Sequence, residues 1–304
     1  MSLRFDDEVV IVTGAGGGLG RAYALELAAR GAKVVVNDLG GPKDGTGGDE
    51  AAAAAVVRQI TEAGGQAVGS ADSVATPEGG QAIVDLAMTT WGRVDALISN
   101  AGILRDKSFA KVDWADNRAI FDVHLFGGGF YVAQPAFNAM RQGGRGGRIL
   151  FTTSASGLFG NFGQTSYGAA KMGLIGLIRT LAIEAAKDDI KVNALAPIAG
   201  TRLSSSGELP PEAPRSTARV VPAALAFAHH DCPASGEIVM AGGGWFSRPF
   251  IGLTPGWDAG PDELTPEAVV ANWAKIADPA GFTEPVSAKQ IGQMLNAHIG
   301  DRES

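Results

Sequence analysis

Short apolar runs alternate with helical patterns over the first 241 residues, and this alternation constrains the fold more than any other feature. Seven runs have the length and composition of buried strands: 9–12, 34–37, 67–70, 96–99, 148–152, 192–196 and 237–241. Helical patterns separate them, near 19–30, 50–63, 77–91, 114–141, 166–187 and 222–229. This pattern predicts an α/β fold with a doubly wound parallel sheet, because parallel neighbours need the crossovers that helices provide.

A glycine-rich turn, Thr13–Gly20, joins the first predicted strand to its helix. The order strand, glycine turn, helix is typical of a dinucleotide-binding loop. In such a loop Gly14 permits the tight turn, Gly18 lets the backbone approach a pyrophosphate, and Gly20 allows close helix packing. The N-terminus of the following helix then faces the phosphates with the positive end of its dipole.

A carboxylate ends the second predicted strand. Asp38 follows Lys33–Asn37, eighteen residues after Gly20, where a carboxylate receives the adenosine ribose hydroxyls of NAD. Asp38 would repel the 2′-phosphate of NADP, and neither Ala15 nor Leu39 offers a cation to bind that group. The sequence therefore predicts NAD as the cofactor. A simple turn residue at the strand end is the alternative interpretation of Asp38.

Tyr167 and Lys171 lie four residues apart, and Ser154 precedes Tyr167 by thirteen. Residues four apart on a helix share a face, so the Lys171 ammonium can sit beside the phenol. A phenol with a pKa near 10 is a poor base at neutral pH, and a neighbouring cation lowers that pKa. The pattern predicts a tyrosine that exchanges a proton with a substrate hydroxyl, to which Ser154 also donates. An ordinary amphipathic helix is the alternative.

The chain resembles the short-chain dehydrogenase/reductase family. The resemblance rests on the Thr13–Gly20 loop, Asn100–Gly102, the Ser154, Tyr167 and Lys171 set, and Pro197–Thr201. It is closer still to one branch, the (3R)-hydroxyacyl-CoA dehydrogenase portion of peroxisomal multifunctional enzyme type 2. The branch motifs are Leu3–Asp6, Gly20–Leu25, Val36–Gly41, Ala101–Asp106, Ser154–Gly157, Gly160–Gln164 and Leu264–Trp273.

The resemblance implies a Rossmann-like, seven-stranded parallel sheet of order 3-2-1-4-5-6-7 with a C-terminal helical extension. It implies an NAD-dependent dehydrogenase acting on (3R)-hydroxyacyl-CoA thioesters. A hydroxysteroid or other secondary-alcohol dehydrogenase is the alternative, and a non-catalytic NAD-sensing protein is the least favoured. The implied cofactor-binding residues are Thr13, Gly14, Gly18, Leu19, Gly20, Asp38, Asp72, Ser73, Asn100, Ala101, Gly102, Tyr167, Lys171, Pro197, Ile198 and Thr201.

Four residues are implied to be catalytic: Ser154, Tyr167, Lys171 and His124. His124 stands where most of the superfamily places an asparagine that anchors a water chain beyond the catalytic lysine. The resemblance therefore implies a relay or substrate-side role for its imidazole. A histidine that only packs in the core is the alternative.

Composition argues against several other partners. A formal charge of −7 without a basic cluster disfavours nucleic acid, and no apolar run approaches the length of a membrane span. One cysteine, Cys232, and no clustered His, Cys or carboxylate spacing predict neither a disulfide framework nor a metal site. The N-terminus does not resemble a signal peptide and the C-terminus lacks a Ser-Lys-Leu address, so we expect a cytoplasmic protein.

Residues 1–241 are predicted to form the NAD-binding domain and residues 242–304 a C-terminal extension. The extension carries two amphipathic helical patterns, beginning near Thr265 and Ser287. Such helices cannot bury their apolar stripes alone, so we expect the extension to pack on the same domain or on a neighbouring subunit. An apolar stripe on the predicted helix at 166–187 predicts a homodimer or homotetramer, unless that stripe covers the sheet. The stripe consists of Leu174, Leu177, Ile178 and Leu181.

Overall fold

The computed structural model describes residues 3–42, 44–46, 51–201, 209–260 and 263–303. The chain divides into two compact units, Met1–Arg248 and Pro249–Ser304. The first unit contains the sheet and its covering helices, and the second contains the last helices of the chain.

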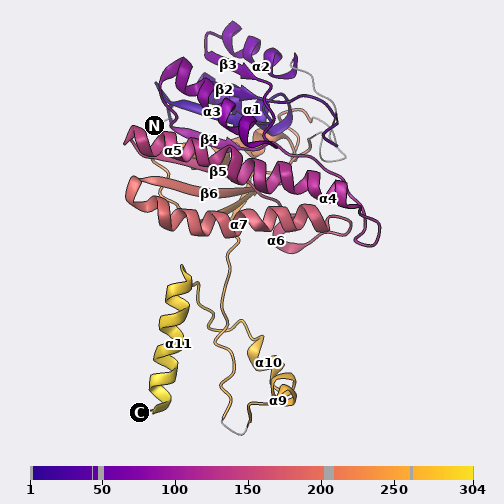
Figure 1. Cartoon of the computed structure of the whole chain (residues 1–304), viewed down its shortest axis with the longest axis vertical. Helices are drawn as coiled ribbons and strands as arrows, with labels where there is room; N and C mark the ends of the chain where they lie inside the picture. The colour runs from indigo at the N-terminus through magenta and orange to yellow at the C-terminus, as the bar shows by residue number, and fades with distance from the viewer. Residues whose placement is uncertain (1–2, 43, 47–50, 202–208, 261–262, 304) are drawn as a thin grey trace. The chain divides into compact units, whose positions relative to one another are not determined.

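Eight strands of the described chain form one sheet in the order β3-β2-β1-β4-β5-β6-β7-β8 (Figure 1). Their bounds are β1 Val9–Thr13, β2 Lys33–Asn37, β3 Gln66–Ser70, β4 Ala96–Ser99, β5 Gly147–Thr152, β6 Ile190–Pro197, β7 Ile238–Gly242 and β8 Trp245–Ser247. The first seven strands are parallel, which confirms the predicted order.

The eighth strand differs from expectation, because the sheet was predicted to be complete by Ala241. β8 pairs antiparallel with β7, so that Trp245 lies opposite Gly242. Gly243 and Gly244 have φ angles of 63° and 84° and form the two-residue turn between the strands. Two consecutive positive φ angles are the requirement of a tight hairpin turn, which glycine meets without strain. The first residues of the predicted extension therefore add a strand to the sheet.

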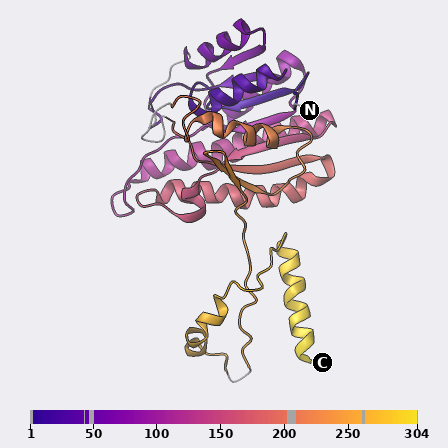
Figure 2. The same cartoon turned by 180° about the vertical axis from the view of Figure 1, so that it is seen from behind.

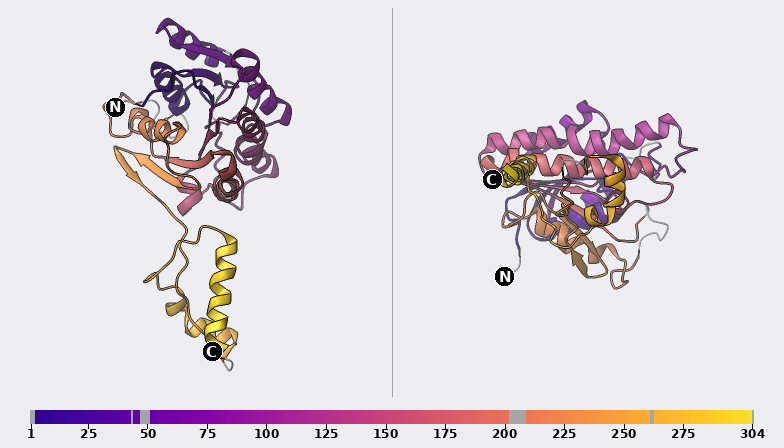
Figure 3. Two further views of the ribbon diagram at one scale, coloured as in Figure 1. Left: turned by 90° about the vertical axis from the view of Figure 1, so that its left-hand side faces the viewer. Right: turned by 90° about the horizontal axis from the view of Figure 1, so that it is seen from below.

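Helices cover both faces of the sheet (Figure 3). On one face lie α1 Gly18–Ala29, α2 Ala51–Glu62 and α8 Val221–Ala228, the last drawn in orange in the reverse view (Figure 2). On the other lie α3 Pro77–Trp91, η1 Asp122–Tyr131, α5 Ala133–Gly143 and α7 Thr165–Ala185. Shorter elements are α4 Trp114–Phe121, α6 Ala155–Phe159, η2 Ala186–Asp188 and η3 Thr217–Arg219.

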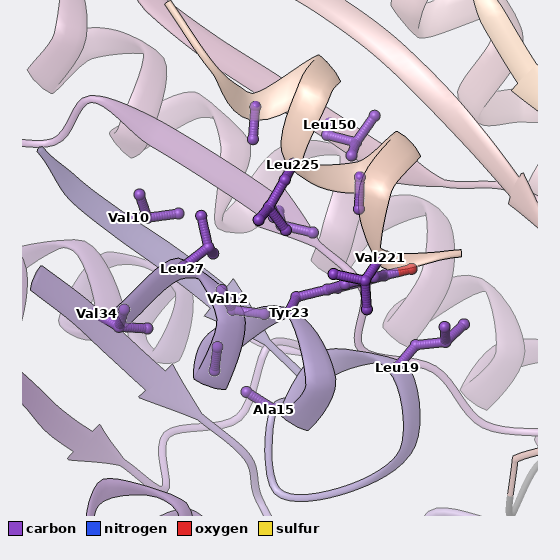
Figure 4. Close-up of a cluster of buried hydrophobic side chains, with 14 of the residues drawn as sticks. Val10, Val12, Ala15, Leu19, Tyr23, Leu27, Val34, Leu150, Val221 and Leu225 are labelled. Atoms are coloured by element: carbon purple, nitrogen blue, oxygen red, sulfur yellow. The ribbon is translucent and has the colours of Figure 1, made fainter. Parts of the chain in front are cut away.

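The strand residues alternate between two cores. Val10 and Val12 of β1 pack with Tyr23 and Leu27 of α1 on one face (Figure 4). Val9 and Ile11, the alternate residues of the same strand, belong to the core of the other face. Because both faces are buried, the strand reads as a continuous apolar run, which explains why it was readily predicted.

The apolar stripe on α7, which was predicted to form an oligomer interface, faces the core of the protein. Leu174 and Ile178 are buried, and Leu177 and Leu181 pack against the same core. These four residues therefore cover the sheet, as the alternative interpretation proposed. None of the helices in the described ranges combines the length and apolar character needed to cross a membrane.

The stretch predicted as one helix at 114–141 is three elements. α4 runs into η1, a π-helix of ten residues, before α5 begins. η1 contains Gly127, where an added Cβ would lie 2.6 Å from the backbone oxygen of Val74. At Gly128 an added Cβ would lie 2.7 Å from Ser99 Oγ. Glycine thus lets the wide turns of η1 approach the end of β4, and π-helical segments often occur at functional sites.

The second unit contains α9 Pro266–Ala271, α10 Trp273–Ile276 and α11 Ala288–Glu303. α9 begins where it was predicted, with the Thr265 side chain as its cap and Pro266 in its first turn. A bridge pairs Leu253 with Thr283, each donating its backbone amide to the other over 2.9 Å.

Candidate active site

A cavity of about 640 Å³ lies at the carboxyl edge of the sheet. Ligands of open α/β sheets bind at this edge, beyond the ends of the strands. The predicted site residues that line it are Gly14, Gly18, Leu19, Asp38, Asp72, Ser73, Asn100, Ala101, Gly102, His124, Ser154, Tyr167, Lys171, Pro197 and Thr201. Thr13, Gly20 and Ile198 were also predicted but are not among the lining residues.

Two glycines of the loop are required because other backbone atoms approach them too closely for a Cβ. Gly14 has a φ of 65°, and an added Cβ there would lie 2.7 Å from Ala101 Cα. At Gly20 an added Cβ would lie 2.1 Å from the Gly14 oxygen. Gly20 therefore acts in packing, as predicted, and not in contact with the cavity. Gly17, which has no side chain, occupies the N-cap of α1, so the positive end of the helix dipole borders the cavity.

Thr13 and Asn100 tie together the ends of β1 and β4. The Thr13 hydroxyl, fully buried, accepts hydrogen bonds from the amides of Asn100 at 3.0 Å and Ala101 at 3.1 Å. In return, Asn100 Nδ2 donates to the oxygens of Thr13 and Gly14, both at 3.1 Å. Thr13 therefore shapes the cavity without lining it.

Asp38 is held rigidly where β2 ends. Its Oδ2 accepts the Gly16 amide at 2.7 Å and its Oδ1 accepts the Gly40 amide at 2.8 Å. Asn37, one residue earlier, donates from Nδ2 to the backbone oxygen of Asp72 at 2.9 Å, and the Ser70 hydroxyl donates to Asp72 Oδ2 at 2.9 Å. Both predicted carboxylates, Asp38 and Asp72, therefore occupy fixed positions on one wall of the cavity.

Tyr167 and Lys171 lie on α7, and burial dominates the electrostatics of both. Lys171 Nζ donates to the Thr152 oxygen at 2.6 Å and lies 5.7 Å from the Tyr167 ring centroid. Burial lowers the pKa of the Lys171 amine to about 7. Burial also raises the pKa of the Tyr167 phenol, which hydrogen bonding to Ser154 partly offsets and the Asp106 charge reinforces. This direction is opposite to the lowering expected from Lys171, because each ionised group loses solvation.

Ser154 begins a short helix that the sequence did not predict. It is the N-cap of α6, where its Oγ accepts the Ser156 amide at 3.1 Å. α6 packs closely on α7, because a Cβ added at Gly157 would lie 2.9 Å from Lys171 Cβ. This contact brings the hydroxyl of Ser154 to the Tyr167 phenol.

His124 lies in η1 with only 2% of its surface exposed. Its Nε2 is 2.8 Å from the Ile103 oxygen and 3.1 Å from the Ile103 amide nitrogen, and its ring meets the Tyr167 ring edge-on at 5.1 Å. Burial and the Lys171 charge hold its pKa well below the usual range, so the imidazole is neutral. Its Nδ1 is buried and has no hydrogen-bond partner among the described residues.

A hydrogen-bond network beside the cavity was missed from the sequence. Gln164 donates from Nε2 to Asp106 Oδ2 at 2.8 Å. Its Oε1 accepts from Ser156 Oγ at 2.7 Å and from Asn161 Nδ2 at 3.0 Å. Gln164, Ser156 and Asn161 all line the cavity. The Gly160–Gln164 motif contained the signal, but only as part of a resemblance and without an assigned contact.

Residues 8–205 match the family model described as short chain dehydrogenase. The chain belongs to the short-chain dehydrogenase family. It is therefore an oxidoreductase enzyme, as the sequence predicted.

Two curated relatives extend over most of the chain. A short-chain type dehydrogenase/reductase of Mycobacterium tuberculosis is 47% identical, over 90% of this chain and 96% of the relative. The peroxisomal multifunctional enzyme type 2 of Mus musculus is 44% identical, over 95% of this chain but only 39% of its own length. These matches confirm the predicted resemblance to the multifunctional-enzyme branch. They also show that this chain spans less than half of the mouse protein.

Two solved structures share the fold. The full-length peroxisomal multifunctional enzyme type 2 from Drosophila melanogaster has a TM-score of 0.81 and 34% identity, covering 98% of this chain and 50% of the fly chain. A 7α-hydroxysteroid dehydrogenase complexed with NADH and 7-oxo glycochenodeoxycholic acid has a TM-score of 0.69 and 31% identity, covering 79% of this chain and 95% of that chain.

Proposed function

We propose that this enzyme is an NAD-dependent dehydrogenase that interconverts a secondary alcohol and a ketone, with (3R)-hydroxyacyl-CoA thioesters as its substrates. One observation carries the proposal. The glycine loop and Asp38 line the same cavity as Ser154, Tyr167 and Lys171. A cofactor bound against the first group would bring its reactive end to the second.

The residues present fit a nicotinamide cofactor. The loop beside α1 and Thr201 would hold the diphosphate, Asp38 the adenosine ribose, and Pro197 with the Ile198 backbone the nicotinamide end. Such a cofactor would supply the acceptor for the hydride that leaves the alcohol carbon. The two amide hydrogen bonds to Asp38 keep its carboxylate in place. A fixed negative charge there favours NAD over NADP, because a 2′-phosphate would be repelled.

The chain's own residues handle the proton. Tyr167 takes the proton of the substrate hydroxyl, while Ser154 donates a hydrogen bond to the same oxygen. The positive charge of an oxidised nicotinamide in the cavity would counter the burial that raises the phenol's pKa, because a nearby opposite charge favours the phenolate. Lys171 acts from beneath the Tyr167 ring and would also bind the nicotinamide ribose. Neutral His124 is a positioning residue in this proposal. It holds the Ile103 backbone through Nε2 and supports the Tyr167 ring with its edge.

The substrate class rests on the relatives and on exposed aromatic residues that flank a cavity-lining residue in sequence. The similarity to type 2 multifunctional enzymes favours acyl thioesters, whereas the similarity to a 7α-hydroxysteroid dehydrogenase favours a steroid alcohol. Phe159 and Phe162 are 71% and 91% exposed, and Asn161, which lies between them in sequence, lines the cavity. Apolar surface of this kind suits an acyl chain or a sterol ring system.

A substrate panel tests the proposal. Purified enzyme is assayed with NAD and with NADP on (3R)- and (3S)-hydroxyacyl-CoAs of short and long chain, and on free hydroxysteroids. We expect the highest kcat/KM on a (3R)-hydroxyacyl-CoA, with NAD preferred by at least about tenfold. Faster turnover of steroids would establish the alternative. Tight NAD binding without turnover on any substrate would instead support the NAD-sensing function.

A further inference from the structure

A second cluster of chemically versatile side chains lies at the amino ends of the strands. Glu8 directly precedes β1, and His229 and His230 directly follow α8. One possible ligand atom from each lies within 4.8 Å of the other two. The sequence predicted no metal site, because Glu8 and His230 are 222 positions apart and only the fold brings them together.

His229 already has the arrangement of a metal-binding histidine. Its Nε2 lies 2.8 Å from the Arg4 carbonyl oxygen, which can only accept a hydrogen bond. Nε2 therefore carries the ring proton, and Nδ1 keeps a lone pair. Histidines that bind metals usually donate their other ring N–H to a carbonyl in this way. The Phe5 ring, edge-on at 4.9 Å, fixes the orientation of the buried imidazole.

Nδ1 of His229 is only weakly engaged by protein groups. It accepts the Asp231 backbone amide at 3.2 Å, the long end of the hydrogen-bond range, so a metal ion would displace this one bond. A carboxylate oxygen of the same residue, Asp231 Oδ2, lies 3.7 Å away. A carboxylate oxygen thus lies near this lone pair and could share an ion with it.

Glu8 and His230 supply the other side of the cluster. His230 Nδ1 lies 2.8 Å from Glu8 Oε1, and its Nε2 lies 3.2 Å from Asp231 Oδ1. The His230 side chain is 62% exposed and can turn, while Arg148 donates to its carbonyl oxygen and fixes its backbone.

We propose that Glu8, His229 and His230 bind a divalent cation of the zinc class, with Asp231 able to approach as a further ligand. Two imidazoles and a carboxylate form a donor set suited to Zn²⁺, whereas Mg²⁺ prefers oxygen alone. Bonds of about 2.0–2.1 Å place tetrahedral ligand atoms roughly 3.3 Å apart, so the cluster needs only small side-chain movements. None of these residues lines the cavity, so the ion would fasten the N-terminal segment to the end of α8 and take no part in hydride transfer.

Titration of zinc chloride into chelator-treated enzyme, by calorimetry and by thermal melting, tests the proposal. We expect one zinc ion per chain and a higher Tm, with little effect of magnesium chloride. Glu8→Gln and His230→Gln should each weaken zinc binding by more than about tenfold, since even outer-shell changes at metal sites reach that size. The matched control is His298→Gln, in the second unit, which should bind zinc as the wild type does.

NAD binding by each variant serves as the folding control, because the cluster lies outside the cavity. If Glu8→Gln proves unfolded, zinc binding by His230→Gln provides the test, because the exposed His230 can be replaced with little effect on folding. The proposal is overturned if wild-type enzyme takes up no zinc or if His230→Gln binds zinc as tightly as the wild type. Loss of binding in His298→Gln, or an equal rise in Tm with magnesium, would also overturn it.

Discussion

At the scale of single residues, the buried amine of Lys171 sets the electrostatics of the site. Lys171 is 3% exposed, and its amine donates a 2.6 Å hydrogen bond to the Thr152 backbone oxygen. A charged amine in such a place costs stability, which active sites commonly accept in return for function. The buried neighbours Tyr167 and His124 share this environment.

Replacing Lys171 with methionine should stabilise the cofactor-free protein at neutral pH. The amine's pKa is 10.5 when exposed and about 7 in the fold. Between these values the unfolded chain binds more protons, so wild-type stability rises with pH across this window. The difference between the two pKa values corresponds to at most about 5 kcal/mol of unfolding free energy. Urea unfolding at pH 7 should give Lys171→Met a higher unfolding free energy than wild type. At pH 10 the difference between the two proteins should be smaller. A gap that does not change with pH would contradict the burial argument.

His124 should affect catalysis through position. His124→Ala removes the Nε2 contacts to Ile103 and the edge contact with Tyr167, so we expect kcat to fall by about tenfold or more while NAD affinity changes little. His124→Asn restores a polar side chain and should recover part of the rate. Steady-state kinetics and NAD titration of both variants make the comparison. Equal rates in the two variants would indicate a purely packing role.

At the scale of elements, the glycines of η1 let this helix approach the sheet edge on which the site is built. The wide turns place His124 beside Tyr167, and Gly102 leaves room for it. A Cβ added at Gly102 would lie 2.6 Å from His124 Cε1. The local geometry of η1 is therefore part of the site.

Gly127→Ala should destabilise the fold, because its Cβ would meet the Val74 oxygen at 2.6 Å and backbone cannot move aside cheaply. We expect a loss of about 1–3 kcal/mol in unfolding free energy. Gly176→Ala on α7 is the matched control, since nothing lies within 4 Å of its added Cβ. That change should stabilise by about 0.5–1 kcal/mol through helix propensity. Urea denaturation compares the two, and similar losses in both would refute the close approach of η1.

The elements that the sequence predicted well are those with a strong local signal. The run Val9–Val12 is buried on both faces, and Gly14 is required by a positive φ, so each is visible without tertiary information. α6 and the π-helical turns of η1 were missed because they depend on packing against other elements, whereas β8 follows from the local Gly243–Gly244 turn, a signal that was overlooked. The burial that moves the Lys171 pKa is likewise a property of the fold.

At the scale of the whole molecule, apolar side chains remain on the outer face of the helical layer. Phe126 and Phe130 of η1 are 40% and 43% exposed, and Met172 and Ile183 of α7 are 40% and 58% exposed. The stripe first assigned to an interface covers the sheet instead. That the second unit packs on the same domain or on a neighbouring subunit stays a prediction.

We predict that the enzyme is a homodimer or homotetramer that uses this outer face. Burying these side chains against a second copy would remove apolar surface from water, and a two-fold axis lets each face pair with itself. Light scattering at micromolar concentration should give a multiple of the 31.1 kDa chain mass. Phe130→Asp should lower that mass, whereas a wild-type monomer would contradict the prediction.

The central claim is that Tyr167 is the proton acceptor in the cavity where hydride transfer occurs. Its most direct test is the turnover number of Tyr167→Phe with NAD and the best alcohol of the panel, measured beside NAD affinity. Removing one hydroxyl leaves the ring packing against His124 intact, so NAD affinity should stay within a few fold of wild type. We predict a rate below about one hundredth of wild type, the scale of a lost general base. A variant that keeps more than about a tenth of the wild-type rate would contradict the claim.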